Sequence, residues 1–131
     1  GGHDAPRGVA GATFPAMSLG AGKPIVRLPG VGMLRAVQAV TSLLPLASDI
    51  PHPVACMQVG GTEAPYLSGL QREVVGHLQS HLPPGTSVES VERYAFYDQV
   101  SIAYAIVVTG ELQPWGNFIL HKGVIGETLR L

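Results

Sequence analysis

Cysteine and charge are both scarce in this sequence of 131 residues. The single cysteine, Cys56, excludes an intrachain disulfide and a metal site built from several thiolates. Charged residues make up only 13% of the chain and the formal net charge is −1, so the composition offers no strongly basic surface for nucleic acid. We therefore expect no nucleic-acid partner.

Long hydrophobic runs are absent as well. The most apolar stretch, residues 31–46, is interrupted by Arg35, Gln38 and Pro45 and is too short to cross a bilayer. We expect no membrane span. Apolar residues nevertheless reach 46%, which is high for one small domain and predicts apolar surface that is covered by a partner.

The chain begins with Gly1-Gly2 where a primary translation product has Met. This start is expected either for a processed organellar or secreted chain or for a cloning scar, and the compartment stays open.

Glycine and proline punctuate the first thirty residues without a lasting hydrophobic period. This pattern predicts that residues 1–53 form an irregular arm. The arm contains one short helix over about residues 32–44, because apolar residues recur there at helical spacing and Pro45 ends the run. Its apolar side chains are the candidates for binding a partner: Phe14, Met17, Leu19, Ile25, Val26 and Leu28.

The second half, residues 54–131, is more regular. A short strand over 54–59 is followed by a helix over 65–82, which the pattern of leucine and valine predicts. That stripe consists of Leu67, Leu70, Val74, Leu78 and Leu82. Residues 87–131 then read as three or four β runs rich in Tyr, Val and Ile. The predicted fold class is therefore α+β, with a long helix packed against an antiparallel sheet of four to five strands.

The order of these segments resembles the cystatins, and the single-domain stefins most closely. The segments that carry the resemblance are "GGTEA" at 60–64, the helix at 65–82, "SVESVERYAFYDQV" at 87–100, "YAIVVTG" at 104–110 and "NFILHKG" at 117–123. The resemblance covers about residues 54–131. It implies a helix wrapped by the antiparallel sheet and reversible inhibition of papain-like cysteine proteases.

In that family a three-part wedge enters the protease cleft. Carried over by position, the wedge here comprises Gly60, Gly61, Gln99, Val100, Ser101, Ile102, Ala103, Gly123, Val124, Ile125 and Gly126. The sequence departs from the family motif at Ser101 and Ala103, and the second hairpin has no proline. A Pro-Trp pair does exist at 114–115, but the predicted meander places it at the far end from the wedge.

Catalytic and metal-binding patterns are weak. His77 and His81 lie four residues apart on the predicted helix, but no third ligand follows by spacing, so we expect them to be structural and predict no metal site. No Ser/His/Asp set, carboxylate pair or Cys/His pair can be assigned, and we predict neither an enzyme nor a bound cofactor.

Three hypotheses for function follow. The first is a wedge-type protease inhibitor. The second is a structural or accessory subunit that reuses a cystatin-like fold and lies against neighbouring subunits of a complex through its arm. The third is a small-molecule-binding or enzymatic domain with a cone-shaped sheet.

Overall fold

The computed structural model describes residues 8–12 and 22–124, with side chains from residue 22 onward. Its elements, in chain order, are β1 (Gly8–Ala12), β2 (Ile25–Leu28), α2 (Met33–Leu43), β3 (Val54–Met57), α3 (Gly69–Leu78), the 3-10 helix η2 (Gln79–His81), β4 (Val88–Val91), α4 (Arg93–Ser101), β5 (Ala105–Thr109) and β6 (Phe118–His121). The strands form one six-stranded sheet in the order β2-β5-β1-β6-β3-β4.

Five of the six strands run in the same direction. β1 and β2 are parallel to β5, β3 is parallel to β4, and β6 is antiparallel to both of its neighbours, β1 and β3. The carboxyl ends of five strands therefore lie at one edge of the sheet, together with the start of β6. We call this the carboxyl edge, and the other the amino edge.

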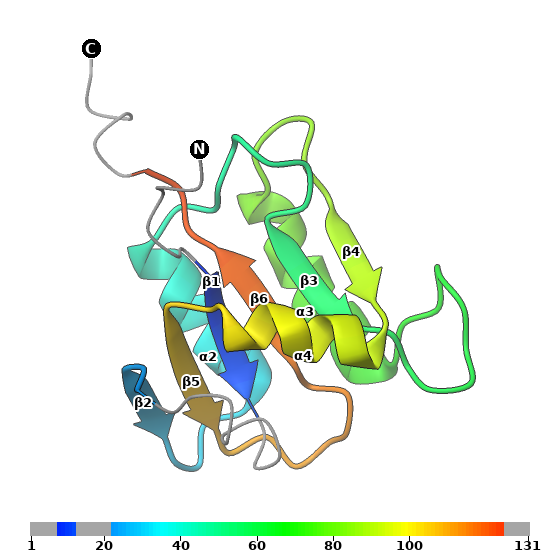
Figure 1. Ribbon diagram of the computed structural model, residues 1–131, viewed down its shortest axis with the longest axis horizontal. Helices are drawn as coiled ribbons and strands as arrows, with labels where there is room; N and C mark the ends of the chain where they lie inside the picture. Colours follow the sequence, from blue (N-terminus) through cyan, green and yellow to red (C-terminus); the bar gives the residue numbers. More distant parts are fainter. Residues whose placement is uncertain (1–7, 13–21, 125–131) are drawn as a thin grey trace.

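Helices cover both faces of the sheet (Figure 1). α2 and α3 pack on one face, where Met33 and Val37 meet Leu70, Val74 and Leu78 in a single buried cluster. α4 crosses the other face and buries Phe96 and Val100. The molecule thus has three layers, helix, sheet and helix, as expected for a largely parallel sheet.

The short strand β3 shows why a sheet covered on both faces suits this sequence. Its residues, Val54 to Met57, are all buried. Val54 and Cys56 contribute to the cluster with α2 and α3, while Ala55 and Met57 contribute to the cluster with α4. An uninterrupted apolar run is typical of such a strand, since neither face meets water. Burial also raises the pKa of the Cys56 thiol.

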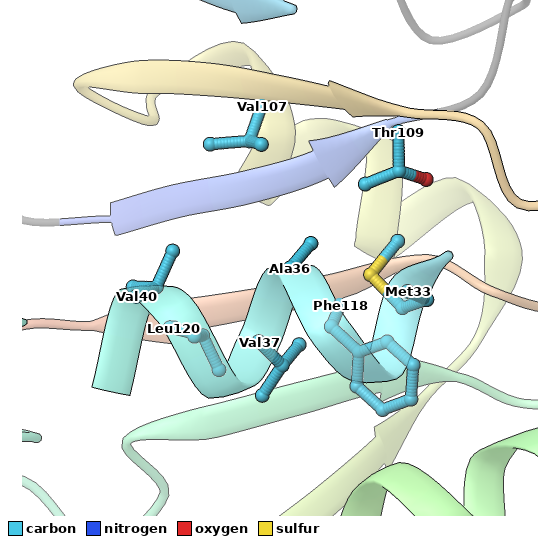
Figure 2. Close-up of a pocket in the computed structure, with 8 residues that line it drawn as sticks. All are labelled: Met33, Ala36, Val37, Val40, Val107, Thr109, Phe118 and Leu120. Atoms are coloured by element: carbon cyan, nitrogen blue, oxygen red, sulfur yellow. The ribbon is translucent and has the colours of Figure 1, made fainter. Parts of the chain in front are cut away.

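A small apolar cavity of about 20 Å³ lies between α2 and the sheet. Figure 2 shows Val107 and Thr109 of β5 on one side of it and Met33, Ala36 and Val40 of α2 on the other. The volume is about that of one water molecule and the lining is almost entirely apolar, which identifies a packing gap and not a ligand site.

The predicted helix-on-antiparallel-sheet fold is wrong. The helix expected over 65–82 begins at Ser68, whose hydroxyl accepts from the Gln71 main chain in a capping box, and its α-helical part ends at Leu78. The β run expected over 90–100 is divided between β4 and α4 by Glu92, whose carboxylate caps α4. The meander is also replaced, because β4 and β5 are not neighbours and each pairs with a parallel strand.

The first half of the chain contributes to the same sheet as the second. β1 lies between β5 and β6, and β2 is the outermost strand on one side of the sheet, where it pairs with β5. The division of the chain at residue 53 stays a prediction. Among the described residues, no helix is long and apolar enough to cross a membrane.

Candidate functional site

A pocket of about 250 Å³ opens at the carboxyl edge, where the segments after β3 and β4 meet the segment before β6. Its lining consists of Gln58, Val59, Gly60, Gly61, Thr62, Glu92, Arg93 and Trp115. In open α/β sheets, ligands bind beyond the carboxyl ends of the strands, where loops can vary while the sheet stays fixed. This position makes the pocket a candidate functional site.

Hydrogen bonds fix the wall that follows β3. The main-chain N–H of Gln58 donates to Val91 O at 2.8 Å and so continues the pairing between β3 and β4. The side-chain Nε2 of Gln58 donates to Thr62 Oγ1 at 2.8 Å, and that hydroxyl donates to Val59 O at 2.7 Å. Gly61 completes the turn at φ +75°, a conformation that residues with a Cβ rarely adopt. The wall of the pocket that follows β3 is therefore a turn held by its own hydrogen bonds.

Glu92 and Arg93 bring charge to the pocket at the start of α4. Glu92 Oε2 accepts from the main-chain N–H groups of Tyr94 and Ala95 at 3.0 and 3.1 Å. A carboxylate is favoured there, because the N-terminus of a helix carries unpaired N–H groups and a positive dipole. The Arg93 guanidinium lies 5.9 Å from the ring centre of Tyr94 and 5.8 Å from that of Tyr97. The site thus presents an anion and a cation side by side.

Trp115 forms the wall contributed by the segment before β6. Its φ of 64° is left-handed, and it is the one described non-glycine residue with a positive φ. Such backbone strain costs about 1–3 kcal/mol and persists only where the surroundings enforce it, most often at functional sites. A Cβ placed on Gly60 would lie 3.4 Å from Trp115 Cη2, so the indole lies directly beside the turn after β3.

Asn117, two residues further on, is buried with an unpaired acceptor. The residue is 7% exposed, and its Oδ1 has no hydrogen-bond partner. A buried acceptor of this kind costs free energy until a donor reaches it. Strain at Trp115 and an unpaired oxygen at Asn117 therefore occur within three residues of the same segment. Trp115 lines the pocket, and Asn117 lies immediately before β6 in the same segment.

A larger pocket, of about 550 Å³, lies at the amino edge between the ends of α2 and α3. It is lined in part by Thr41 and His81. His77 is nearby: its Nε2 lies 3.0 Å from Thr41 Oγ1, and its ring centre lies 4.7 Å from that of His81. Burial, and secondarily His81, lower the pKa of His77. Nowhere in residues 22–124 do three His, Cys, Asp or Glu side chains gather to hold a metal ion.

The structure separates the residues predicted to form a protease wedge. Gly60 and Gly61 line the carboxyl-edge pocket. Gln99, Val100 and Ser101 end α4, and Ile102 and Ala103 follow it toward the amino edge, with Val100 and Ala103 buried. Gly123 and Val124 follow β6 at that same amino edge. Ile125 and Gly126 lie outside the described residues.

The arm candidates also divide into two groups. Ile25 and Val26 are exposed on the edge strand β2, and Leu28 is partly buried there. Phe14, Met17 and Leu19 lie outside the described residues. Sequence reasoning missed Glu92, Arg93 and Asn117, and it placed Trp115 at the wrong end of the fold. The signal that could have located the site is "PWGN" at 114–117, a rigid turn sequence that carries the sole tryptophan.

The layered fold, with a pocket beyond the carboxyl ends of its strands, is that of an α/β protein with a largely parallel sheet. Residues 1–125 match the model of the RbsD/FucU transport protein family. The chain belongs to that family.

Two relatives and one solved structure are similar over most of the chain. The L-fucose mutarotase of Actinobacillus pleuropneumoniae serotype 5b is 35% identical over 115 residues, which is 86% of this chain and 76% of the relative. The fucose mutarotase of Homo sapiens is 35% identical over 116 residues, covering 86% and 74%. The fucose mutarotase of Streptococcus pneumoniae, solved in complex with L-fucose, superposes with a TM-score of 0.77 at 25% identity, covering 95% of this chain and 87% of that one.

These findings correct the functional predictions. The resemblance to cystatins is wrong, and so are the inhibitor and accessory-subunit hypotheses that depended on it, since the relatives are sugar mutarotases. The prediction of a chain without enzymatic activity is wrong for the same reason. The predicted protein partner is wrong as well, since the relatives are sugar-processing enzymes that act on a small molecule.

Proposed function

We propose that this chain is a mutarotase that interconverts the α and β anomers of L-fucose, and that the carboxyl-edge pocket is where the sugar binds. The family membership and the two fucose mutarotases at 35% identity support the reaction and the substrate. The observation that carries the placement is Trp115, held in a left-handed conformation beside Gly60 at the mouth of the pocket.

An indole in this position suits a sugar ring. One face of a pyranose presents C–H groups, and a flat aromatic side chain buries that face while leaving the hydroxyls at its rim free to hydrogen-bond. The strain at Trp115 has a function in this proposal, because it directs the ring toward the turn after β3 instead of away from it. Asn117, two residues further along the same segment, has a buried Oδ1 without a partner, which suits a water that bridges to the sugar.

The remaining polar groups suit a neutral polyol. Arg93 donates hydrogen bonds, Glu92 accepts them, and the Gln58 carboxamide can do both. An anionic or cationic ligand would be opposed by one of the two charges at the start of α4. Fucose carries no charge and offers several hydroxyls that both donate and accept.

Mutarotation needs proton transfer and no redox change. A base takes the proton of the anomeric hydroxyl while an acid protonates the ring oxygen, and the bond between C1 and the ring oxygen breaks. The aldehyde turns about C1–C2, and the reverse transfers close the ring on its other face. Within the described lining of the pocket, Glu92 is the one carboxylate, and two N–H groups hold its Oε2 in place. We assign the transfer of the anomeric proton to it.

Anomer exchange followed by NMR on L-fucose at equilibrium tests the proposal. The wild-type chain should raise the α–β exchange rate in proportion to its concentration. Trp115→Ala should reduce kcat/KM by roughly 10- to 100-fold, since the ring's orientation depends on the indole. Tyr104→Ala is the matched control, because that aromatic side chain is exposed near the amino edge. A wild-type chain that leaves the exchange rate of L-fucose unchanged would refute the function.

A further inference from the structure

Glu111 joins two parts of the molecule that are distant in sequence. Its Oε1 accepts from the main-chain N–H of Met33 at 2.9 Å, across 78 residues. Its Oε2 accepts from the N–H groups of Leu112 and Gln113 at 3.1 and 3.2 Å. One carboxylate therefore holds both the N-terminus of α2 and the start of the β5–β6 segment, residues 110–117.

α2 depends on this distant carboxylate for its cap. Its N-cap residue is Gly32, which has no side chain to accept from the first N–H groups, and no acidic residue lies in the first turn. An anion at a helix N-terminus is stabilised by the unpaired N–H groups and the dipole. The three N–H donors also lower the pKa of Glu111, Met33 first, so the side chain is ionised at neutral pH.

Close packing fixes the carboxylate. A Cβ on Gly32 would lie 3.3 Å from Glu111 Oε1, and one on Gly116 would lie 3.2 Å from Glu111 Cγ. A Cβ on Gly110 would lie only 2.7 Å from Gly30 N, so the start of the segment also touches the turn after β2. These three glycines allow the segment to lie directly against the start of α2.

The same segment delivers Trp115 and Asn117. A left-handed tryptophan and a buried amide oxygen without a hydrogen-bond partner are both unfavourable, and both require a rigid frame. We propose that Glu111 is a positioning residue for the sugar site, which holds the 110–117 segment against the start of α2 and so fixes Trp115 at the pocket and Asn117 at the start of β6. The inference rests on the proposed function for its catalytic consequence. The geometric consequence, an ordered Trp115, is independent of it.

Trp115 reports directly on this role, because it is the only tryptophan of the chain. Glu111→Gln leaves the shape of the side chain but replaces one acceptor oxygen by an NH₂ that faces N–H donors. We expect the tryptophan emission to shift to the red and its near-UV circular dichroism band to weaken, while the far-UV helix signal is retained. The kcat/KM for L-fucose exchange should fall by roughly 10- to 100-fold, as for a misplaced binding group. Glu73→Gln, on the exposed face of α3, is the matched control and should change none of these.

A second variant separates positioning from capping. Arg35→Glu in the Glu111→Gln background places a carboxylate in the first turn of α2 at an exposed position, where the helix N-terminus stabilises it, and should recover thermal stability. It should not recover the tryptophan signals or kcat/KM. If Glu111→Gln alone fails to fold, the tryptophan emission and near-UV dichroism are measured on the double variant instead. Glu111 only stabilises the N-terminus of α2, and the proposal is overturned, if Arg35→Glu restores the tryptophan signals along with stability.

The proposal is equally overturned if Glu111→Gln keeps wild-type tryptophan emission and near-UV dichroism. These spectra need no sugar. A wild-type chain without exchange activity, combined with a tryptophan signal that still changes in Glu111→Gln, would refute the mutarotase function and leave the positioning of Trp115 by Glu111 in place.

Discussion

The side-chain amide of Gln71 donates from Nε2 to the main-chain carbonyl of Met57 at 2.7 Å. Gln71 is fully buried on α3, and Met57 is the last residue of β3. The Oε1 of the same side chain accepts from Ser68 N at 3.0 Å. One glutamine therefore connects the start of α3 to the end of the strand from which the pocket's first wall continues.

Gln71→Met should destabilise the protein. Methionine matches the volume but makes neither hydrogen bond, so the Met57 carbonyl and the Ser68 N–H remain buried or half-buried without these partners. We expect a loss of about 2–3 kcal/mol in the free energy of unfolding, measured by denaturant titration. Gln79→Met, at the exposed end of α3, is the control and should change it little. Equal midpoints for the two variants would show that the buried amide does not stabilise this junction.

Two exposed glycines should respond oppositely to alanine. Gly76 lies inside α3, and a Cβ there would meet nothing within 4 Å. Gly76→Ala should therefore raise the free energy of unfolding by about 0.5–1 kcal/mol through helix propensity. Gly61 has as much space, but its φ is +75°, so Gly61→Ala should lower stability by roughly 1 kcal/mol. Thermal unfolding of both variants checks this, and a stabilising Gly61→Ala would contradict the left-handed turn.

The pH dependence of stability should reflect His77. Desolvation, and then the nearby His81, lower its pKa from the ordinary value of 6.5, so the unfolded chain binds a proton more readily than the folded one. His77 therefore contributes stability that is present above pH 6.5 and is lost as the pH falls through the lower folded value. NMR titration of the His77 ring should place its pKa below 6.5, and His81→Gln should raise it. A His77 pKa that is unchanged by His81→Gln would exclude the coupling between the two rings.

Local patterns identified some of the elements but not their partners. The leucine and valine stripe predicted which side chains of the central helix are apolar, and Leu70, Val74 and Leu78 are indeed buried. The β run predicted over 90–100 is wrong because Tyr, Phe and Val favour strands, whereas Glu92 caps a helix that buries Phe96 and Val100 one turn apart. Parallel pairing joins strands far apart in sequence, and no local spacing encodes it.

The site was harder to predict than the helices. Its residues come from three separate segments, and only the strand order brings Gly60, Glu92 and Trp115 to one edge. The antiparallel meander expected from the sequence placed Trp115 at the opposite end from Gly60. Because the predicted strand directions are wrong, the sequence alone does not place Trp115 beside Gly60.

Glu92→Gln is the most direct test of the proposed chemistry. A glutamine oxygen still accepts from the Tyr94 and Ala95 N–H groups, so α4 keeps its cap and the fold should survive. The carboxamide does not take up a proton at neutral pH, and general base catalysis typically contributes about 10²- to 10⁴-fold to a rate. We therefore expect kcat for L-fucose exchange to fall within that range while KM changes little. Glu63→Gln, on the exposed part of the loop before α3, is the matched control for loss of a carboxylate. If Glu92→Gln keeps the wild-type kcat, a different group takes the anomeric proton, whereas a raised KM at unchanged kcat would assign Glu92 to sugar binding alone.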